Sequence, residues 1–249
     1  MSTTPMHAYT VPESLIPGHL HPNTQRKYRE VLRKFQVTRE TTWPDVLAAV
    51  NAVANINTRR TCIMVLRQVL GREGAPAVPR SIRRTYDLPS AEEIVERSAG
   101  KYQYLALVMA FAGLRLSEAV ALRASDVHAN ATQCWLVVSR SRDNDGRTNA
   151  AKTTGKVVIP RWLFDVLQAA EYADVRPGSV YKWLRRRGLQ PHGLRHWYAT
   201  HLVRTTKNVE LARRQLRHAN LQTTLQVYVE VTAEDELELI ADMANPLAS

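Results

Sequence analysis

The pattern of apolar and polar positions divides the chain into helical stretches and one short β-rich stretch. Within residues 21–36, apolar side chains recur at helical spacing, while basic residues occupy the other faces of the predicted helix. Two further helices are predicted over 42–53 and 57–71, and the second of them ends at Gly71. The first part of the chain is therefore expected to be helical.

The second part of the chain combines helices with a small sheet. Residues 104–114 (YLALVMAFAGL) are apolar on every side, which is typical of a buried central helix, and Ser90 begins a capping box (SAEE). The convincing strands are CWLVVS at 134–139 and KVVIP at 156–160, with a long polar segment between them. The predicted fold is mainly α with a small antiparallel β-sheet.

Composition shifts along the chain indicate five segments. They are a flexible N-terminus (1–18), a helical domain (19–74), a basic linker rich in proline (75–89), a second domain (90–232) and an acidic tail helix (233–249). In the tail, Leu237, Ile240 and Ala241 lie on one helical stripe.

The net charge of +11 is unevenly distributed along the chain. Residues 230–249 contain no Lys or Arg but six acids: Glu230, Glu234, Asp235, Glu236, Glu238 and Asp242. Residues 1–229 therefore carry a formal charge of +17. This excess of positive charge favours binding to a polyanion. Nucleic acid is a better candidate than an anionic membrane surface, because the sequence has no separate long amphipathic basic stretch of the kind that binds membranes.

Cysteine usage and the N-terminus indicate a reducing compartment. Cys62 and Cys134 lie far apart and form no CxxC pair, which argues against a disulfide framework and against a cysteine-based zinc site. The N-terminus lacks the features of a signal peptide, and the longest apolar run is too short to span a bilayer. The predicted location is cytoplasmic, with no membrane partner.

The sequence HGLRH at 192–196 permits three interpretations. His192 and His196 have the i, i+4 spacing of two zinc ligands, whereas His192 and Arg195 are one turn apart and could hold a phosphate. The third interpretation is a polar start of a surface helix. A catalytic zinc helix would need Glu in place of Gly193, so no metal is expected.

Four separated stretches occur in a characteristic order: AGLRLSEAVALR, AAKTTGKVVIP, HGLRHWYATHL and LRHANLQTTLQVYVEV. In this order and spacing they resemble the tyrosine recombinases, which include phage integrases and the Xer proteins. The resemblance covers residues 86–230, and HPNTQRKYREVLRKF is similar to the first helix of a core-binding domain. It implies a helical core-DNA-binding domain followed by a tyrosine-recombinase catalytic domain.

The resemblance implies six catalytic residues, namely Arg115, Lys152, His192, Arg195, His218 and the nucleophile Tyr228. Glu118 matches the position that braces the site. Lys156 is a second choice for the lysine, because the segment between the strands is longer than usual. Arg217 stands where the family usually has glycine, which affects the turn before His218.

The chemistry of DNA cleavage needs these residue types. A free tyrosine has a pKa of about 10, so only about one in a thousand is phenolate at pH 7. Two arginines offer planar charged forks for the phosphate, two histidines can donate or move protons, and a lysine can protonate the leaving oxygen. The resemblance implies that the tyrosine becomes covalently linked to the 3′-phosphate of the cleaved strand. Because this phosphotyrosyl bond conserves the energy of the broken bond, neither a cofactor nor ATP is expected.

The expected partner is double-stranded DNA with core-type recombination sites. Contacts with it are predicted for basic residues of the helices and the linker: Arg26, Lys27, Arg59, Arg60, Arg83, Arg84, Lys182, Arg185 and Arg186. By resemblance, four protomers would synapse two duplexes and exchange strands through a Holliday junction. The tail would dock on a neighbouring protomer or, alternatively, on its own domain.

The biological setting expected from the resemblance is integration or excision of DNA, including phage genomes, in a bacterial or phage-infected cell, close to the nucleoid. The residues before Pro22 are too few for a separate arm-binding domain, so a small form acting on short core sites is predicted. Two alternatives remain. A non-catalytic helical DNA-binding regulator would explain the charge but not the ordered motifs, and a type IB topoisomerase-like enzyme would share the chemistry.

Overall fold

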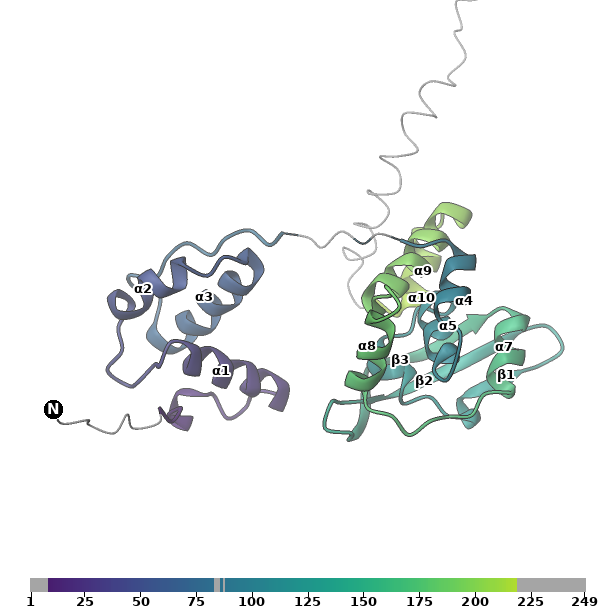
Figure 1. Ribbon diagram of the computed structural model, residues 1–249, viewed down its shortest axis with the longest axis horizontal. Coiled ribbons are helices and arrows are strands. Elements are labelled where there is room, and N and C mark those ends of the chain that lie inside the picture. Colours follow the sequence, from purple (N-terminus) through teal and green to yellow (C-terminus); the bar gives the residue numbers. More distant parts are fainter. Residues whose placement is uncertain (1–8, 83–85, 87, 219–249) are drawn as a thin grey trace, which may run out of the picture. The chain divides into compact units, whose positions relative to one another are not determined.

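A computed structural model describes residues 9–82, 86 and 88–218 of the chain. Several predicted features lie outside the described residues: Arg83, Arg84, Tyr228 and the tail over 233–249. The chain divides into two compact units, Met1–Thr85 and Tyr86–Ser249 (Figure 1). The division falls within the predicted linker.

The first unit consists of helices around one apolar core. Its elements are η1 (Glu13–Leu15), α1 (Pro22–Lys34), α2 (Trp43–Asn51) and α3 (Ile56–Leu70). The three α-helices begin after His21, Thr42 and Asn55. The side chains of His21 and Asn55 accept hydrogen bonds at the helix N-termini, and the N–H and hydroxyl of Thr42 donate to Asp45. Leu32 and Leu66 are fully buried where α1 and α3 pack together. The three predicted helices are confirmed.

The prediction of a flexible N-terminus over 1–18 is wrong for part of that range. Val11 and Ile16 are buried in the core of the first unit, at 8% and 7% exposure. Between them, Glu13 accepts two hydrogen bonds of 2.8 Å from Arg29 of α1. Val11 and Ile16, which flank the short 3-10 helix η1, therefore extend the apolar core of the first unit toward the N-terminus.

The beginning of the predicted linker is attached to α3. Arg67 donates to the carbonyl of Pro76, and Arg60 donates to the carbonyl of Pro79, each at 2.7 Å. The segment 75–82 is thus part of the first unit, and its proline carbonyls are satisfied by arginines of the helix.

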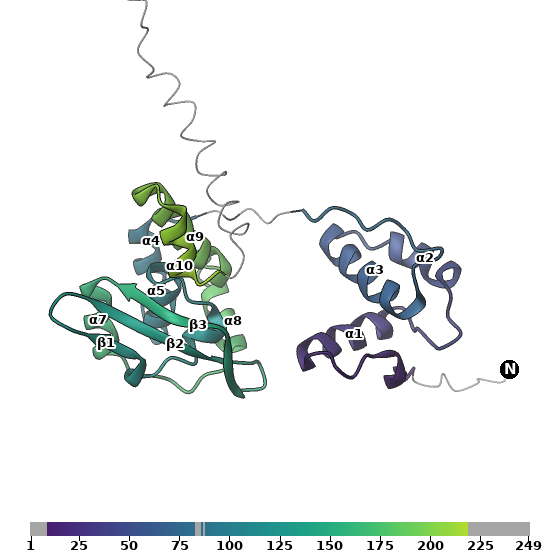
Figure 2. The ribbon, with the colours of Figure 1, turned by 180° about the vertical axis from the view of Figure 1, so that it is seen from behind.

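The second unit is a helical body with a small sheet on one side (Figure 2). Its helices are α4 (Ala91–Arg97), α5 (Gln103–Phe111), α6 (Leu116–Ala119), η2 (Ala124–Asp126), α7 (Arg161–Gln168), α8 (Pro177–Arg185), α9 (Pro191–Thr206) and α10 (Val209–Leu216). Its strands are β1 (Val127–Ala129), β2 (Cys134–Arg142) and β3 (Thr148–Ile159). The predicted mainly helical fold with a small antiparallel sheet is confirmed.

Helix α5 forms the centre of this unit, as its apolar sequence predicts. Leu105, Val108 and Met109 are completely buried, and α5 packs along α9. Two residues after the helix comes Gly113, which has a φ of 64° and where a Cβ atom would lie 2.5 Å from the Tyr198 ring. Only glycine fits this turn, which directs the next residues into the site described below.

The sheet has the antiparallel order β1-β2-β3. Val127 and Val157 both pair with Leu136, so apolar residues of all three strands meet on its inner face. The strands extend through most of the polar segment predicted to separate them, and they meet at a turn that spans 143–147. Lys152, in the polar segment that was predicted to separate the strands, lies within β3.

Other features concern the chain as a whole. Cys62 and Cys134 are buried free thiols, one in each unit. Among the described residues, no helix combines the length and apolar character needed to cross a bilayer.

Candidate functional site

Arg115 and Glu118 are brought together by the local sequence RLSE. Arg115 is the N-cap of α6 and Glu118 is its third residue, so the carboxylate folds back onto the N-cap. Glu118 accepts a hydrogen bond of 2.9 Å from the Arg115 N–H and one of 2.8 Å from Arg115 Nη1. The same Nη1 donates to Thr153 Oγ1 of β3 at 3.1 Å.

Arg195 lies in the second turn of α9 and is buried, with 7% of its surface exposed. Its guanidinium donates to the carbonyl of Gly113 and, at 2.6 Å, to the carbonyl of Leu216. Burial, followed by the charge of Arg115, lowers the pKa of Arg195 to about 9. The side chain therefore keeps its charge at neutral pH and connects α9 to the ends of α5 and α10.

Arg217 joins the same cluster, although it was not predicted as a site residue. Its Nη2 donates to Glu118 Oε2 at 2.5 Å, and both side chains are almost completely buried. The only signal in the sequence was the arginine at a position where the family usually has glycine. The turn expected there is retained, because His218 N–H bonds to the carbonyl of Arg213 at 3.1 Å.

His218 follows directly and faces the three arginines. Burial, and then the charges of Arg195, Arg115 and Arg217, lower its pKa to about 4. The imidazole is therefore neutral at pH 7 and can take part in hydrogen bonds as a donor and as an acceptor. The structure thus brings together five side chains from three separate stretches of the sequence: the three positively charged arginines, the negatively charged Glu118 and the neutral His218.

Tyr198 also lies near these arginines but is unsuited to nucleophilic attack. It is 7% exposed, and burial raises its pKa to about 12. Its ring packs against Gly113, as described above. A phenol in this environment stays protonated and shielded from a bulky substrate.

The two candidate lysines occupy different positions on β3. Lys152 is exposed and precedes Thr153, the residue bonded to Arg115. Lys156 places its ammonium group 3.8 Å from the centroid of the Trp135 ring on β2. The ammonium group of Lys156 is therefore engaged by a neighbouring strand, which favours Lys152 as the lysine of the site.

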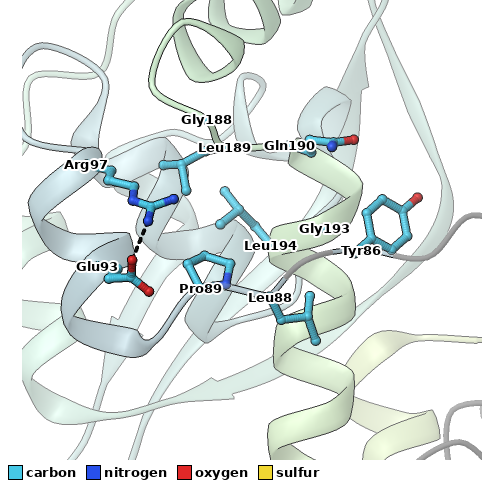
Figure 3. A pocket seen from close by; sticks show the side chains of 10 residues that line it. All are labelled: Tyr86, Leu88, Pro89, Glu93, Arg97, Gly188, Leu189, Gln190, Gly193 and Leu194. Atoms are coloured by element: carbon cyan, nitrogen blue, oxygen red, sulfur yellow. Dashed lines mark hydrogen bonds and ion pairs between the residues drawn. The ribbon is translucent and has the colours of Figure 1, made fainter.

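His192 is exposed in the first turn of α9, one turn before Arg195. A pocket of about 370 Å³ lies beside the start of α9 and is lined by Gln190, Gly193 and Leu194 together with Tyr86 (Figure 3). A Cβ atom on Gly193 would lie 3.2 Å from the Tyr86 ring. The glycine within HGLRH thus allows the segment that precedes α4 to pack on α9.

In the first unit, the predicted DNA-binding residues fall into two groups. Arg26 and Lys27 leave about half of each side chain exposed on α1. Lys27 also borders a hollow of about 450 Å³ with Asn55 and Thr58 at the N-terminus of α3. By contrast, the guanidinium groups of Arg59 and Arg60 donate to backbone carbonyls. The first group is the better placed for phosphate contacts.

In the second unit, Lys182, Arg185 and Arg186 are exposed at the C-terminal end of α8. Arg187, which follows them, lies 4.0 Å from the centroid of the Trp183 ring. The three predicted residues therefore form an exposed basic end of the helix.

An apolar groove of about 630 Å³ crosses the surface where α5, α7, α9 and α10 meet the edge of β3. Trp162 and Val158 line it and are 44% and 42% exposed. Trp197 and Leu202 form part of its floor. Exposed tryptophan and valine in one groove are typical of a surface that binds another segment.

Residues 175–235 match the model of the phage integrase family. The chain is 28% identical over 182 residues to tyrosine recombinase XerA of Pyrococcus horikoshii, covering 66% of this chain and 63% of that protein. It is 30% identical over 201 residues to tyrosine recombinase XerD of Bradyrhizobium diazoefficiens, covering 69% of this chain and 62% of that protein. The matches span less than two thirds of the length of these curated relatives.

The fold is also similar to a solved structure, the Tn1549 transposon integrase in complex with transposon right end DNA. The TM-score is 0.65 at 15% sequence identity, and the match covers 92% of this chain and 99% of the other. At this identity the likeness concerns the fold alone.

We expect His218 to make stability depend on pH between its ordinary pKa of 6.5 and its lowered value of about 4. In this interval the unfolded chain binds the proton more strongly, so stability present above pH 6.5 is lost as the pH falls. Urea denaturation at pH 7.5 and 4.5 measures the loss. His218→Asn should lose less stability than the parent, whereas His201→Asn, at an exposed position of α9, should match it. Equal losses in the parent and His218→Asn would contradict the prediction.

Proposed function

We propose that the chain is a member of the tyrosine recombinase and phage integrase family, to which it is similar in sequence, and that it is a site-specific DNA recombinase. It cleaves and rejoins duplex DNA through a 3′-phosphotyrosyl intermediate. The observation that carries the proposal is the cluster of Arg115, Arg195 and His218 around buried Glu118. Such a set of fixed charges is suited to one phosphodiester.

In the first step, the Tyr228 hydroxyl oxygen attacks the phosphorus atom and the bond to the 5′-oxygen breaks. Arg115 binds the phosphate through its exposed edge, and Arg195 adds a fixed charge beside it. The bound phosphate offsets the arginine charges that, with burial, lower the pKa of His218, so His218 can accept the phenolic proton, and His192 donates to a phosphate oxygen. Lys152 protonates the leaving 5′-oxygen.

In the second step, a 5′-hydroxyl of another strand attacks the phosphotyrosyl bond and releases Tyr228. The number of phosphodiester bonds is unchanged, so the exchange needs no ATP or other cofactor. Four protomers on two synapsed core sites would carry out successive exchanges through a Holliday junction. The task proposed is integration or excision of DNA in the cytoplasm, at the nucleoid.

Tyr228→Phe should abolish covalent attachment and leave DNA binding nearly unchanged, since only the nucleophilic oxygen is removed. The assay incubates the protein with a suicide DNA substrate and detects the protein–DNA adduct on a denaturing gel. An adduct with the Phe variant would refute the assignment. Absence of an adduct with the parent protein would favour a non-catalytic regulator, and relaxation of supercoiled DNA without exchange between duplexes would favour a topoisomerase-like enzyme.

Lys152→Ala should slow strand cleavage more than Lys156→Ala, because the Lys156 ammonium group is held over Trp135. A 5′-bridging phosphorothiolate supplies a leaving group that needs no proton. This substrate should restore cleavage by the Lys152 variant. Restoration of the Lys156 variant alone would reverse the assignment.

The C-terminal tail, residues 233–249, is proposed to dock on a neighbouring protomer in the tetramer. Its apolar stripe with Leu237 and Ile240 matches the chemistry of the groove lined by Trp162 and Val158. DNA repels the acidic residues of the tail because it is also negatively charged, whereas the basic body of another protomer attracts them.

Deleting residues 233–249 should weaken cooperative DNA binding and synapsis more than binding to one half-site. Val158→Asp should have the same effect, because it places a charge in the groove. Val137→Asp, at a position of similar exposure on β2 outside the groove, is the matched control. Gel-shift titration measures both quantities, and unchanged cooperativity in the deletion variant would favour packing of the tail on its own domain.

A further inference from the structure

Arg217 has a backbone conformation that does not suit arginine. It follows α10 with φ 53° and ψ 42°, in the left-handed region. Glycine adopts this region freely, whereas other residues are disfavoured there by contacts of Cβ. The Arg217 side chain takes no part in the bonds that close the turn, which run from Arg217 N–H to the Arg214 carbonyl and from His218 N–H to the Arg213 carbonyl. The reason for arginine must therefore lie in its side chain.

The side chain of Arg217 is enclosed by the catalytic unit. Only 4% of it is exposed, and Nη2 donates to Glu118 Oε2 at 2.5 Å. Its stem crosses β3 at Gly155, where an added Cβ atom would lie 3.2 Å from Arg217 Cδ. The absence of a side chain at Gly155 thus makes room for the guanidinium to reach Glu118.

The Glu118 carboxylate is fixed by three donors. Its Oε1 accepts from Arg115 Nη1 at 2.8 Å, and its Oε2 accepts from the Arg115 N–H at 2.9 Å as well as from Arg217. Both hydrogen bonds that the Arg115 side chain makes within the described residues come from Nη1, the second one to Thr153. The other donors of the guanidinium, Nε and Nη2, take no part in these two bonds, and 29% of the side chain is exposed.

We propose that Arg217 is a positioning residue of the active site: by holding one oxygen of Glu118, it fixes the orientation in which Arg115 binds the scissile phosphate. This inference rests on the proposed recombinase function. Among the described residues, no acceptor faces Nε or Nη1 of Arg217, although both atoms are buried. Its positive charge is therefore only partly compensated by Glu118 and adds to the field at the phosphate.

The first test compares Arg217→Gly with the parent protein in single-turnover cleavage of a suicide substrate. The variant should cleave about 100-fold more slowly, the typical effect of a misplaced catalytic group, with a Kd for DNA within about twofold of the parent, since uniform binding is retained. Lys207→Gly is the matched control. Lys207 is exposed and also ends a helix in the left-handed region, with φ 52°, and its variant should cleave like the parent.

A second measurement distinguishes positioning from a merely structural role. Millimolar guanidinium can occupy the space vacated in Arg217→Gly and pair with Glu118, so it should restore cleavage in a saturable manner. Urea has the same shape but no charge and should have no effect. Arg217→Lys, which keeps the charge but not the planar fork, should recover only part of the rate.

A third measurement uses the contact with Gly155. Gly155 has a φ of 156°, so alanine is strained there in either background, but Gly155→Ala should slow cleavage more in the parent, where the new methyl group also displaces Arg217, than in the Arg217→Gly background. Equal effects of Gly155→Ala in both backgrounds would overturn the proposal. Cleavage by Arg217→Gly at the parent rate would overturn it too, while leaving the recombinase function intact. Failure of the parent to form any adduct would overturn both.

Discussion

The buried carboxylate of Glu118 is the interaction on which the rest of the site depends. A buried charge is costly unless it is paired and hydrogen-bonded. Glu118 is 3% exposed and accepts three hydrogen bonds from two arginines. Removing the carboxylate would leave those arginines facing each other without compensation. One acidic residue therefore permits several cations to gather in a small volume, which is the condition for binding a phosphate without a metal ion.

The fold serves this arrangement by directing the ends of its elements toward one place. Arg115 follows the buried helix α5, Arg195 lies near the start of α9 and Arg217 follows α10. Arg195 ties these ends together because it donates to carbonyls at the ends of α5 and α10. The carbonyl of Leu216 at the end of α10 and that of Gly113, just after α5, are thereby both satisfied by Arg195. A shift of any one of these helices would be transmitted directly to the phosphate site.

Sequence patterns predicted those parts of the molecule whose signal is local. The helices of the first unit and the central α5 follow from periodicity and capping within a few residues, whereas the place of Glu118 beside Arg115 was expected from the family resemblance. Features that depend on distant contacts were missed. The polar ends of β2 and β3 pair through backbone atoms and show no apolar alternation. Thr153 and Arg217 join the site only because β3 and α10 come to lie beside α6, and nothing in their own neighbourhood indicates it.

The charge balance of the cluster connects its stability to its chemistry. Three guanidinium groups share one carboxylate, and burial together with their mutual repulsion lowers the pKa values of Arg195 and Arg217. In the proposed recombinase, the site without DNA is therefore under electrostatic repulsion that a bound phosphodiester would relieve. In the transition state of phosphoryl transfer more negative charge collects on the phosphate oxygens, so the relief is larger there than in the ground state. In the proposed recombinase, the same repulsion that makes the cluster costly to fold favours the transition state over the bound ground state.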